Sequence, residues 1–181
     1  MHKVVKEIDR PEQATVDLFE DIPPAAIADA STSFGNSMDP GIKPVYTAAR
    51  LLGTAVTIDL QPGDNLLLHK ALKMAEPGDV LDANTNGDTT SGVWGDNTST
   101  SAKTLGLAGT IVDGAVRDVR IIEEIDYPVF TRTVTTRGSG KSAPGSINVP
   151  ISCGGLTVTP GDIVIGDRTG VVAVDPAEAE T

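Results

Sequence analysis

An arginine and an aspartate stand side by side at positions 117 and 118, directly after a short apolar segment. That segment, residues 110–112, is rich in β-branched side chains and predicts a buried strand. The Asp-Gly pair at 113–114 predicts a turn, and residues 119–125 have helical spacing. Because α/β proteins bind ligands at the carboxyl ends of their strands, Arg117 could clamp a carboxylate and Asp118 could hold a hard divalent cation. A surface ion pair at a helix start is the alternative interpretation.

A second group of candidate residues follows the polar, glycine-punctuated segment 84–95. Long irregular loops inside compact domains are frequently functional. Gly95 and Asp96 end this loop and begin a weakly helical run, with Asp96 as the predicted N-cap. A helix N-terminus offers free N–H groups and a partial positive charge, so this position could bind an anion.

Composition limits the class of protein. A chain of 181 residues is expected to form one domain with a proper core. With 25 acidic and 14 basic residues, its net charge of −11 would repel phosphate backbones and argues against nucleic-acid binding. No apolar run reaches the length of a membrane span, and the N-terminus lacks the apolar segment of a signal peptide. The single cysteine, Cys153, excludes an internal disulfide and fits the cytoplasm.

The elements that must position these residues are short. The 19 glycines and 12 prolines indicate many turns, which favours short strands over a helical bundle. The N-terminal part, residues 1–45, is expected to hold two brief helices and an ordered loop from Phe34 to Pro44. In the first helix Ala14, Leu18 and Phe19 would face the core. The core, residues 46–176, is expected to begin with one long strand or a pair of strands around Gly53 at 48–60, followed by a helix capped by Asp64 or Asn65. Further strands are expected at 80–83, 127–131, 147–152, 156–159, 163–165 and 170–174, with a mobile loop at 135–146. A short tail at 177–181 follows the core.

The order of motifs resembles the RraA-like family, which contains 4-hydroxy-4-methyl-2-oxoglutarate aldolases and regulators of ribonuclease E activity. The resemblance covers roughly residues 48–176. It rests on Pro-Gly-Asp-Val, Gly-Asp at a helix start, Gly-x-x-Val-Asp-Gly-x-Val-Arg-Asp, Tyr-Pro-Val-Phe, Asn-Val-Pro-Ile with Gly-Gly, and Pro-Gly-Asp-Ile-Val with Asp-x-x-Gly-Val-Val. It implies one α/β domain of the swivelling β/β/α type, assembled as a homotrimer or as a hexamer of two trimers, with sites between subunits.

Within that family, the aldolases carry Asp, twenty residues and Arg-Asp, whereas the regulators have glycine at the first position. Asp96 and Arg117 have the aldolase spacing. The resemblance therefore implies that Asp118 ligates Mg²⁺ or Mn²⁺ and that Asp96 holds the metal through a water. Arg117 would bind the carboxylate and keto oxygen of pyruvate, and the backbone N–H groups of Asn97 and Thr98 beside Gly95 would complete the carboxylate site. Aldolases of the family tend to have apolar residues where Asn97 and Thr98 stand.

This reading predicts a metal-dependent lyase that acts on a small 2-oxo acid. Retro-aldol cleavage leaves a pyruvate enolate, and a metal and an arginine at its oxygen would stabilise the transition state. Oxaloacetate decarboxylation ends at the same enolate and is expected as a side activity. The alternative is a non-catalytic regulator that binds ribonuclease E or another protein.

Several other residues have both a structural and a functional interpretation. His69 is expected at the surface or an interface, and Cys153 as a small buried residue. Trp94 could form a wall of the site or pack in the core, and Lys141 could screen an anionic substrate or be solvated. Asp82 and Asp88 could support the site indirectly or cap turns. Some family members recruit an acidic residue from a neighbouring subunit, for which Glu178 and Glu180 are the candidates in the tail.

Overall fold

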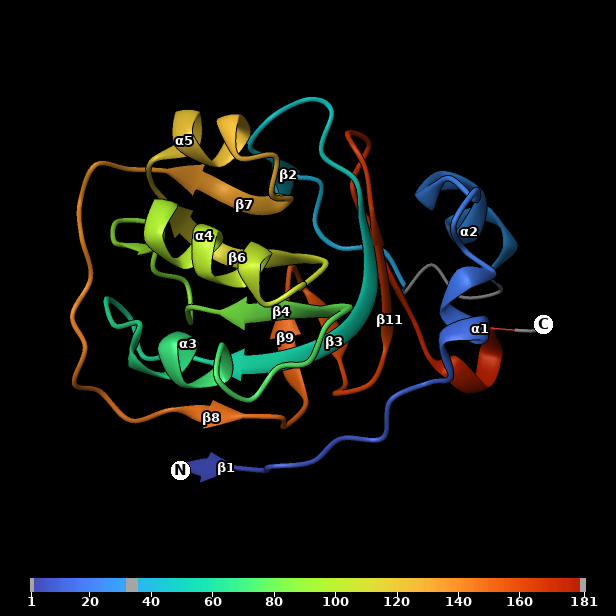
Figure 1. Ribbon diagram of the computed structural model, residues 1–181, viewed down its shortest axis with the longest axis horizontal. Helices are drawn as coiled ribbons and strands as arrows, with labels where there is room; N and C mark the ends of the chain where they lie inside the picture. Colours follow the sequence, from blue (N-terminus) through green and yellow to red (C-terminus); the bar gives the residue numbers. More distant parts are fainter. Residues whose placement is uncertain (1, 32–35, 180–181) are drawn as a thin grey trace.

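The computed structural model describes residues 2–31 and 36–179, and a ten-stranded mixed sheet forms its centre (Figure 1). The strands of this sheet are β1 (Lys3–Val4), β2 (Lys43–Pro44), β3 (Leu51–Asp59), β4 (Asp79–Asn84), β5 (Gly92–Trp94), β6 (Gly109–Val116), β7 (Val129–Val134), β8 (Ser146–Ile147), β11 (Ile163–Gly166) and β12 (Val171–Val174). Strands β9 (Ile151–Cys153) and β10 (Leu156–Val158) pair with each other in a separate hairpin. The helices are α1 (Gln13–Asp17), α2 (Pro24–Ala30), α3 (Leu66–Ala71), α4 (Asp96–Thr104), α5 (Val119–Glu124) and the 3₁₀ helix η1 (Pro176–Glu178).

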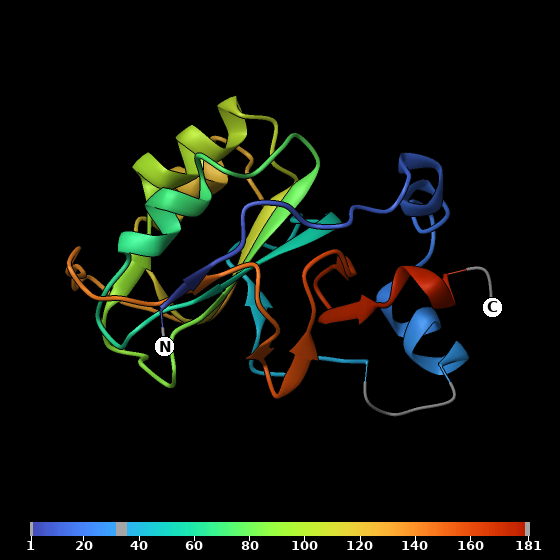
Figure 2. The same cartoon turned by 90° about the horizontal axis from the view of Figure 1, so that it is seen from below.

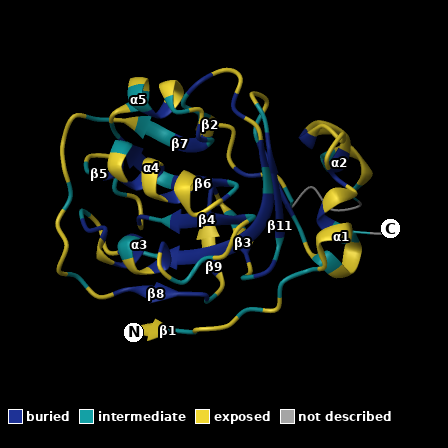
Figure 3. Cartoon of the chain, in the orientation of Figure 1, coloured by how far each residue is buried: buried dark blue, intermediate teal, exposed yellow. Residues whose placement is uncertain are grey.

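The middle of the sheet is parallel. Strands β3, β4, β6 and β7 are neighbours in that order, and each adjacent pair runs in the same direction. Helices α3, α4 and α5 cover one face of these strands, whereas the β9–β10 hairpin lies on the other (Figure 2). Covering both faces explains why β3, β4 and β6 are almost entirely buried and consist largely of apolar residues (Figure 3). The expected α/β fold of short strands with flanking helices is confirmed.

The N-terminal helices pack at the far end of the molecule, against β11 and β12 (Figure 2). The first helix is shorter than expected, and it buries Val16 rather than Ala14 or Leu18. Leu18 is half exposed, whereas Phe19 is buried as predicted. Because α1 has only five residues, its orientation is set by packing on Ile163 and the strands around it, not by its own helical periodicity.

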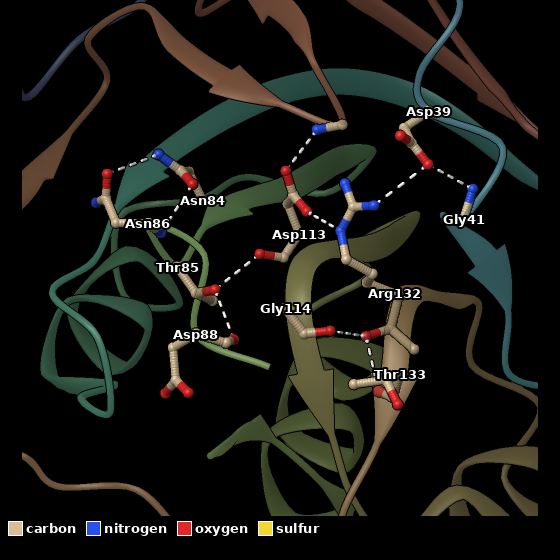
Figure 4. A network of polar contacts seen from close by, with 12 residues as sticks. Asp39, Gly41, Asn84, Thr85, Asn86, Asp88, Asp113, Gly114, Arg132 and Thr133 are labelled. Atoms are coloured by element: carbon tan, nitrogen blue, oxygen red, sulfur yellow. Dashed lines mark hydrogen bonds and ion pairs between the residues drawn. The ribbon is translucent and has the colours of Figure 1, made fainter. Parts of the chain in front are cut away.

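The Asp113-Gly114 pair lies inside β6, so the predicted turn is wrong. The register between β6 and β7 shifts between Val112 and Ala115, as at a β-bulge. Figure 4 shows how this irregularity is held: the Asp113 carboxylate accepts hydrogen bonds from Arg132 at 2.6 Å and from the Gly154 N–H at 2.7 Å. A Cβ on Gly114 would lie 2.5 Å from the Thr85 side chain, so this position requires glycine. Strand β6 continues through the bulge to Val116, directly before Arg117.

The glycine-rich loop at 135–146 is tied to the body of the protein. The Asp64 carboxylate accepts hydrogen bonds from the backbone N–H groups of Ser142 and Ala143 at 2.6 and 3.0 Å. The Gly92 N–H donates to the Arg137 carbonyl oxygen at 2.9 Å. The segment expected to be mobile therefore forms a defined rim beside α3 and β5. Of the ordered loop predicted from Phe34 to Pro44, Phe34 and Gly35 lie outside the described residues, and Lys43–Pro44 is a strand.

Among residues 2–31 and 36–179, no helix has the length and apolar character needed to cross a lipid bilayer.

Candidate active site

One residue separates the end of β5 from the start of helix α4. Gly95, not Asp96, is the N-cap, and Asp96 is the first helical residue. The Thr98 hydroxyl accepts a hydrogen bond from the Gly95 N–H at 3.0 Å and donates to the Gly95 carbonyl oxygen at 2.9 Å. The Asp96 carboxylate accepts from the Asn97 N–H at 2.7 Å. The helix start is thus defined as predicted within one residue, but Asp96 occupies one of the N–H groups expected to bind substrate.

Arg117 and Asp118 connect β6 to α5. The Arg117 N–H donates to the Trp94 carbonyl oxygen at 2.9 Å, which joins this connection to the start of α4. Asp118 has left-handed backbone angles, with φ of 59°, an uncommon conformation outside glycine that turns the chain sharply into the helix. The Arg117 Nε and an Asp118 carboxylate oxygen are 3.2 Å apart, and the two side chains are 42 % and 33 % exposed. The ion pair of the alternative interpretation is present, and both side chains remain accessible to a ligand.

Glycines surround this pair because there is no room for larger side chains. A Cβ on Gly95 would lie 2.6 Å from an Asp118 carboxylate oxygen and 3.2 Å from Arg117 Cγ. A Cβ on Gly92 would lie 2.9 Å from the Arg137 carbonyl oxygen and 3.3 Å from Arg117 Cβ. Gly95 has extended backbone angles that any residue can adopt, so the constraint there is space rather than conformation.

Five of the six predicted site residues border one cavity of about 200 Å³. They are Gly95, Asp96, Asn97, Thr98 and Arg117. The volume is below the range of about 300–1,000 Å³ found for drug-sized ligands, which fits a small metabolite. Asp118 does not border this cavity. It lies in the adjoining groove with Val119 and Val134, and Arg117 borders both spaces.

The wall formed by α3 and the 135–146 loop contributes Asn65 and His69, which the sequence interpretation did not place at the site, and Lys141, which it considered as a screen for an anionic substrate. The Asn65 amide nitrogen donates to the Val93 carbonyl oxygen at 2.9 Å. Its Oδ1 is buried and unpartnered, as is His69 Nε2, among the described residues. Burial lowers the pKa of His69, and the charges of Lys141 and Lys73 lower it further. The signal available in the sequence was Asn65 and His69 four residues apart on one helical face.

Trp94 both packs in the core and forms part of the cavity wall. Its side chain borders the cavity and is 1 % exposed. The indole N–H donates to the Ser99 hydroxyl at 2.7 Å, and the ring stacks on Tyr127 with centroids 6.4 Å apart. These contacts anchor α4 to the sheet and hold the end of β5 rigid beneath the site.

The donors near Arg117 suit a hard cation that keeps most of its water. Within the described part of the chain, no group of three or more His, Cys, Asp or Glu residues could hold a metal ion. Asp118 and Asp96 supply carboxylates, and Mg²⁺ is commonly bound by one or two carboxylates with waters and substrate oxygens completing its shell. The close fit of Asp118 against Gly95 restricts its position. The residues present therefore fit Mg²⁺ or Mn²⁺, and they do not form an all-protein metal cage.

A small acid with a carboxylate and a neighbouring oxygen matches this arrangement. Arg117 offers a planar set of donors, and the first turn of α4 adds backbone N–H groups and the positive end of the helix dipole. Lys141 borders the same cavity and adds a second cation. In a protein of net charge −11, the cavity is therefore bordered by two cations, Arg117 and Lys141, and by the Asp96 carboxylate.

The chain is similar to known proteins of one family. A family model described as RraA-like, Aldolase/RraA, matches residues 24–173. A protein of Halalkalibacterium halodurans named "Putative 4-hydroxy-4-methyl-2-oxoglutarate aldolase" is 41 % identical over 171 residues, which cover 93 % of this chain and 81 % of that protein.

Solved structures of similar fold carry a different description. An RNA-processing inhibitor RraA from Thermus thermophilis has a TM-score of 0.78 at 27 % identity, covering 85 % of this chain and 93 % of that one. Streptomyces coelicolor RraAS2, described as an unusual member of the RNase ES inhibitor RraA family, has a TM-score of 0.87 at 27 % identity, covering 96 % and 90 %.

Proposed function

The chain belongs to the RraA-like family, and from that premise we propose that it is a divalent-metal-dependent lyase that releases pyruvate from 4-hydroxy-4-methyl-2-oxoglutarate or a related 2-oxo acid. The observation that carries the proposal is the cavity that Arg117 and Asp96 share with the N-terminus of α4, beside Asp118. The name of the 41 % identical relative supports the same chemistry.

Each residue has a distinct role in the proposed reaction. Arg117 binds the substrate carboxylate and the 2-oxo oxygen, and the Thr98 N–H in the first turn of α4 contributes to the same carboxylate, since the Asn97 N–H already donates to Asp96. Asp118 would hold Mg²⁺ or Mn²⁺ directly, and Asp96 would hold it through a water. When bound, the cation would act as a Lewis acid that favours negative charge on the 2-oxo oxygen. Gly95 leaves the space in which the Asp118 carboxylate approaches the helix start.

Arg117 would accelerate the reaction because its interaction strengthens as charge develops. The 2-oxo oxygen is neutral in the substrate and becomes an enolate oxygen when the C–C bond breaks, so a fixed guanidinium stabilises the transition state more than the ground state. Loss of one such preorganised group costs about 3–4 kcal/mol, or roughly a hundred- to a thousandfold in rate. Because oxaloacetate decarboxylation also forms pyruvate enolate, we propose it as a side activity.

We further propose a cytoplasmic homotrimer, or a hexamer of two trimers. The groove that contains Asp118 supports this assembly, because it is lined by apolar side chains of Val119, Ile121 and Val134, and Val134 is 56 % exposed. Coverage of this groove by a neighbouring subunit would remove the apolar surface from water and enclose the metal ligand. Glu178 lies in η1 and Glu180 lies outside the described residues, so no acidic ligand is assigned from this tail.

The test is release of pyruvate, measured with lactate dehydrogenase, from 4-hydroxy-4-methyl-2-oxoglutarate and from oxaloacetate, with Mg²⁺ and then with EDTA. EDTA-sensitive turnover above the background of the metal alone is expected. Arg117→Ala and Asp118→Asn should each lower kcat/KM for both substrates by roughly a hundred- to a thousandfold. Full activity in either variant, or an absence of metal-dependent turnover by the native protein, would contradict the proposal.

A second candidate function is inhibition of a ribonuclease. It is favoured by the solved structures, whose descriptions name RNA-processing and RNase ES inhibitors. In this alternative the protein acts through its surface and the Asp96, Arg117 and Asp118 arrangement has no catalytic use. Binding to ribonuclease E without metal-dependent turnover would favour the inhibitor.

A further inference from the structure

The α3 side of the cavity contains polar groups that the roles of Arg117, Asp96 and Asp118 leave unused. Asn65 is the N-cap of α3 and is 7 % exposed, and His69 lies one turn later on the same face of the helix. Asn65 Oδ1 and His69 Nε2 are both buried in the cavity wall without a hydrogen-bond partner among the described residues. Buried polar atoms are nearly always paired with protein groups or ordered water, so these two atoms are available to a polar group or a water inside the cavity.

The position of this wall relative to Arg117 identifies the part of the ligand that it meets. Arg117 and the start of α4 line the same cavity as Asn65 and His69 of α3 and Lys141 of the 135–146 loop. In the proposed substrate the carboxylate and 2-oxo group sit at one end, and the hydroxyl carbon is two bonds beyond the 2-oxo carbon. In a cavity of about 200 Å³, a substrate held by Arg117 at the carboxylate end would meet Asn65 and His69 with its hydroxyl group.

We propose that His69 is the general base that takes the proton of the substrate hydroxyl when the C–C bond breaks, with Asn65 positioning that hydroxyl. This assignment rests on the proposed lyase function. Retro-aldol cleavage requires a base at the hydroxyl, because the O–H electron pair becomes the second bond of the new carbonyl group. Asn65 suits a positioning role because its amide nitrogen is already fixed by the Val93 carbonyl oxygen.

The surroundings of His69 keep its imidazole neutral and able to accept a proton. Burial is the main cause that lowers its pKa below the ordinary value of 6.5, followed by the charges of Lys141 and Lys73. Lys141 faces it from the 135–146 loop, and Lys73 follows α3 in the chain. Arg117 and Asp96 border the same cavity from the α4 side. A neutral imidazole near pH 7 is the form that a general base needs.

The step is balanced in protons and electrons. The hydroxyl proton moves to His69, the O–H pair forms the new C=O bond, and the pair of the broken C–C bond becomes the pyruvate enolate. The methylene carbon of the enolate then gains one proton, and His69 releases the proton that it holds. No oxidant or further reactant is consumed.

Oxaloacetate separates this role from the rest of the site. Its decarboxylation forms the same enolate but has no hydroxyl to deprotonate, so it needs Arg117 and the metal and does not need His69. We expect His69→Gln to lower kcat/KM for 4-hydroxy-4-methyl-2-oxoglutarate by about 10²- to 10⁴-fold while decarboxylation stays close to the native rate. His2→Gln is the matched control, since it replaces the other histidine of the chain, and it should leave both rates unchanged.

Three outcomes are distinguishable. Loss of hydroxy-acid cleavage with retained decarboxylation supports the assignment, and the retained activity itself shows an intact fold. Equal effects of His69→Gln on both substrates, or no effect on either, would overturn it while leaving the lyase proposal standing. If the native protein turns over neither substrate, the lyase proposal fails, and the assignment fails with it.

A measurement on the native protein alone covers the case in which His69→Gln does not fold. The ratio of hydroxy-acid cleavage to decarboxylation should fall as the pH is lowered below 6.5, because protonation of His69 removes the base that only the first reaction requires. A ratio that stays constant over the whole pH range in which the protein remains folded would overturn the assignment.

Discussion

Asp82 in the centre of β4 makes the stability of this protein depend on pH. The residue is completely buried, and neither carboxylate oxygen has a hydrogen-bond partner among the described residues. The thiol of the equally buried Cys153 interacts with it without forming a hydrogen bond of ordinary geometry. Burial raises the pKa of Asp82 from 3.8 to about 7, and the nearby charges of Asp113 and Asp162 contribute in the same direction.

The raised pKa determines the sign and size of the effect. Well below pH 3.8 the carboxyl is protonated in both the folded and the unfolded chain, and its ionisation costs no stability. As the pH rises from 3.8 toward 7, the carboxyl is ionised in the unfolded chain but stays protonated in the folded chain, so the free energy of unfolding falls. A difference of about three pKa units corresponds to a loss of about 4 kcal/mol, at about 1.4 kcal/mol per unit. Asp82→Asn removes this ionisation.

The assay is urea unfolding at fixed protein concentration from pH 4 to pH 8, followed by the fluorescence of Trp94, the only tryptophan. The free energy of unfolding of Asp82→Asn minus that of the native protein should increase by about 4 kcal/mol across this range. Asp29→Asn is the control, since it removes one charge from an exposed position on α2. If Asp82→Asn and Asp29→Asn have the same pH dependence, burial of Asp82 does not govern the effect and the reasoning is refuted.

Two further predictions concern space and charge. Gly95→Ala should weaken metal activation and lower kcat/KM with little loss of stability, because the new Cβ would lie 2.6 Å from the Asp118 carboxylate and displace it. Gly170→Ala is the control, because a Cβ there meets no atom within 4 Å. Equal activities of the two variants would contradict the expectation. Arg10→Ala should lower the free energy of unfolding by about 2–3 kcal/mol, because it leaves the 1 % exposed Asp79 side chain without its two hydrogen bonds from Arg10. Arg120→Ala breaks an exposed pair with Glu124 and should cost at most about 0.5 kcal/mol in the same urea titration, so similar losses in both variants would count against the role of burial.

The sequence by itself determined the class of fold and most of the elements. Largely apolar runs bounded by glycine, proline and aspartate located β3, β4, β6 and β11, because buried strands consist mostly of apolar residues. The same local signals located the starts of α3 and α4 to within a residue or two. The spacing of Asp96 from Arg117, read with the family resemblance, identified five residues that border one cavity.

Only the tertiary structure decided how the elements are oriented and which side chains complete the cavity. The Asp113-Gly114 pair has the local chemistry of a turn, but pairing of β6 with β7 and the Arg132 and Gly154 contacts keep it in a strand. Val16 rather than Leu18 faces the core because a five-residue helix takes its orientation from what it packs against. His69 and Asp82 were not separable from ordinary surface or turn residues by sequence, since burial and the absence of a partner depend on segments far away in the chain. Local chemistry specifies a residue's preferences, whereas its pKa, its accessibility and its place at the site are fixed by those distant neighbours.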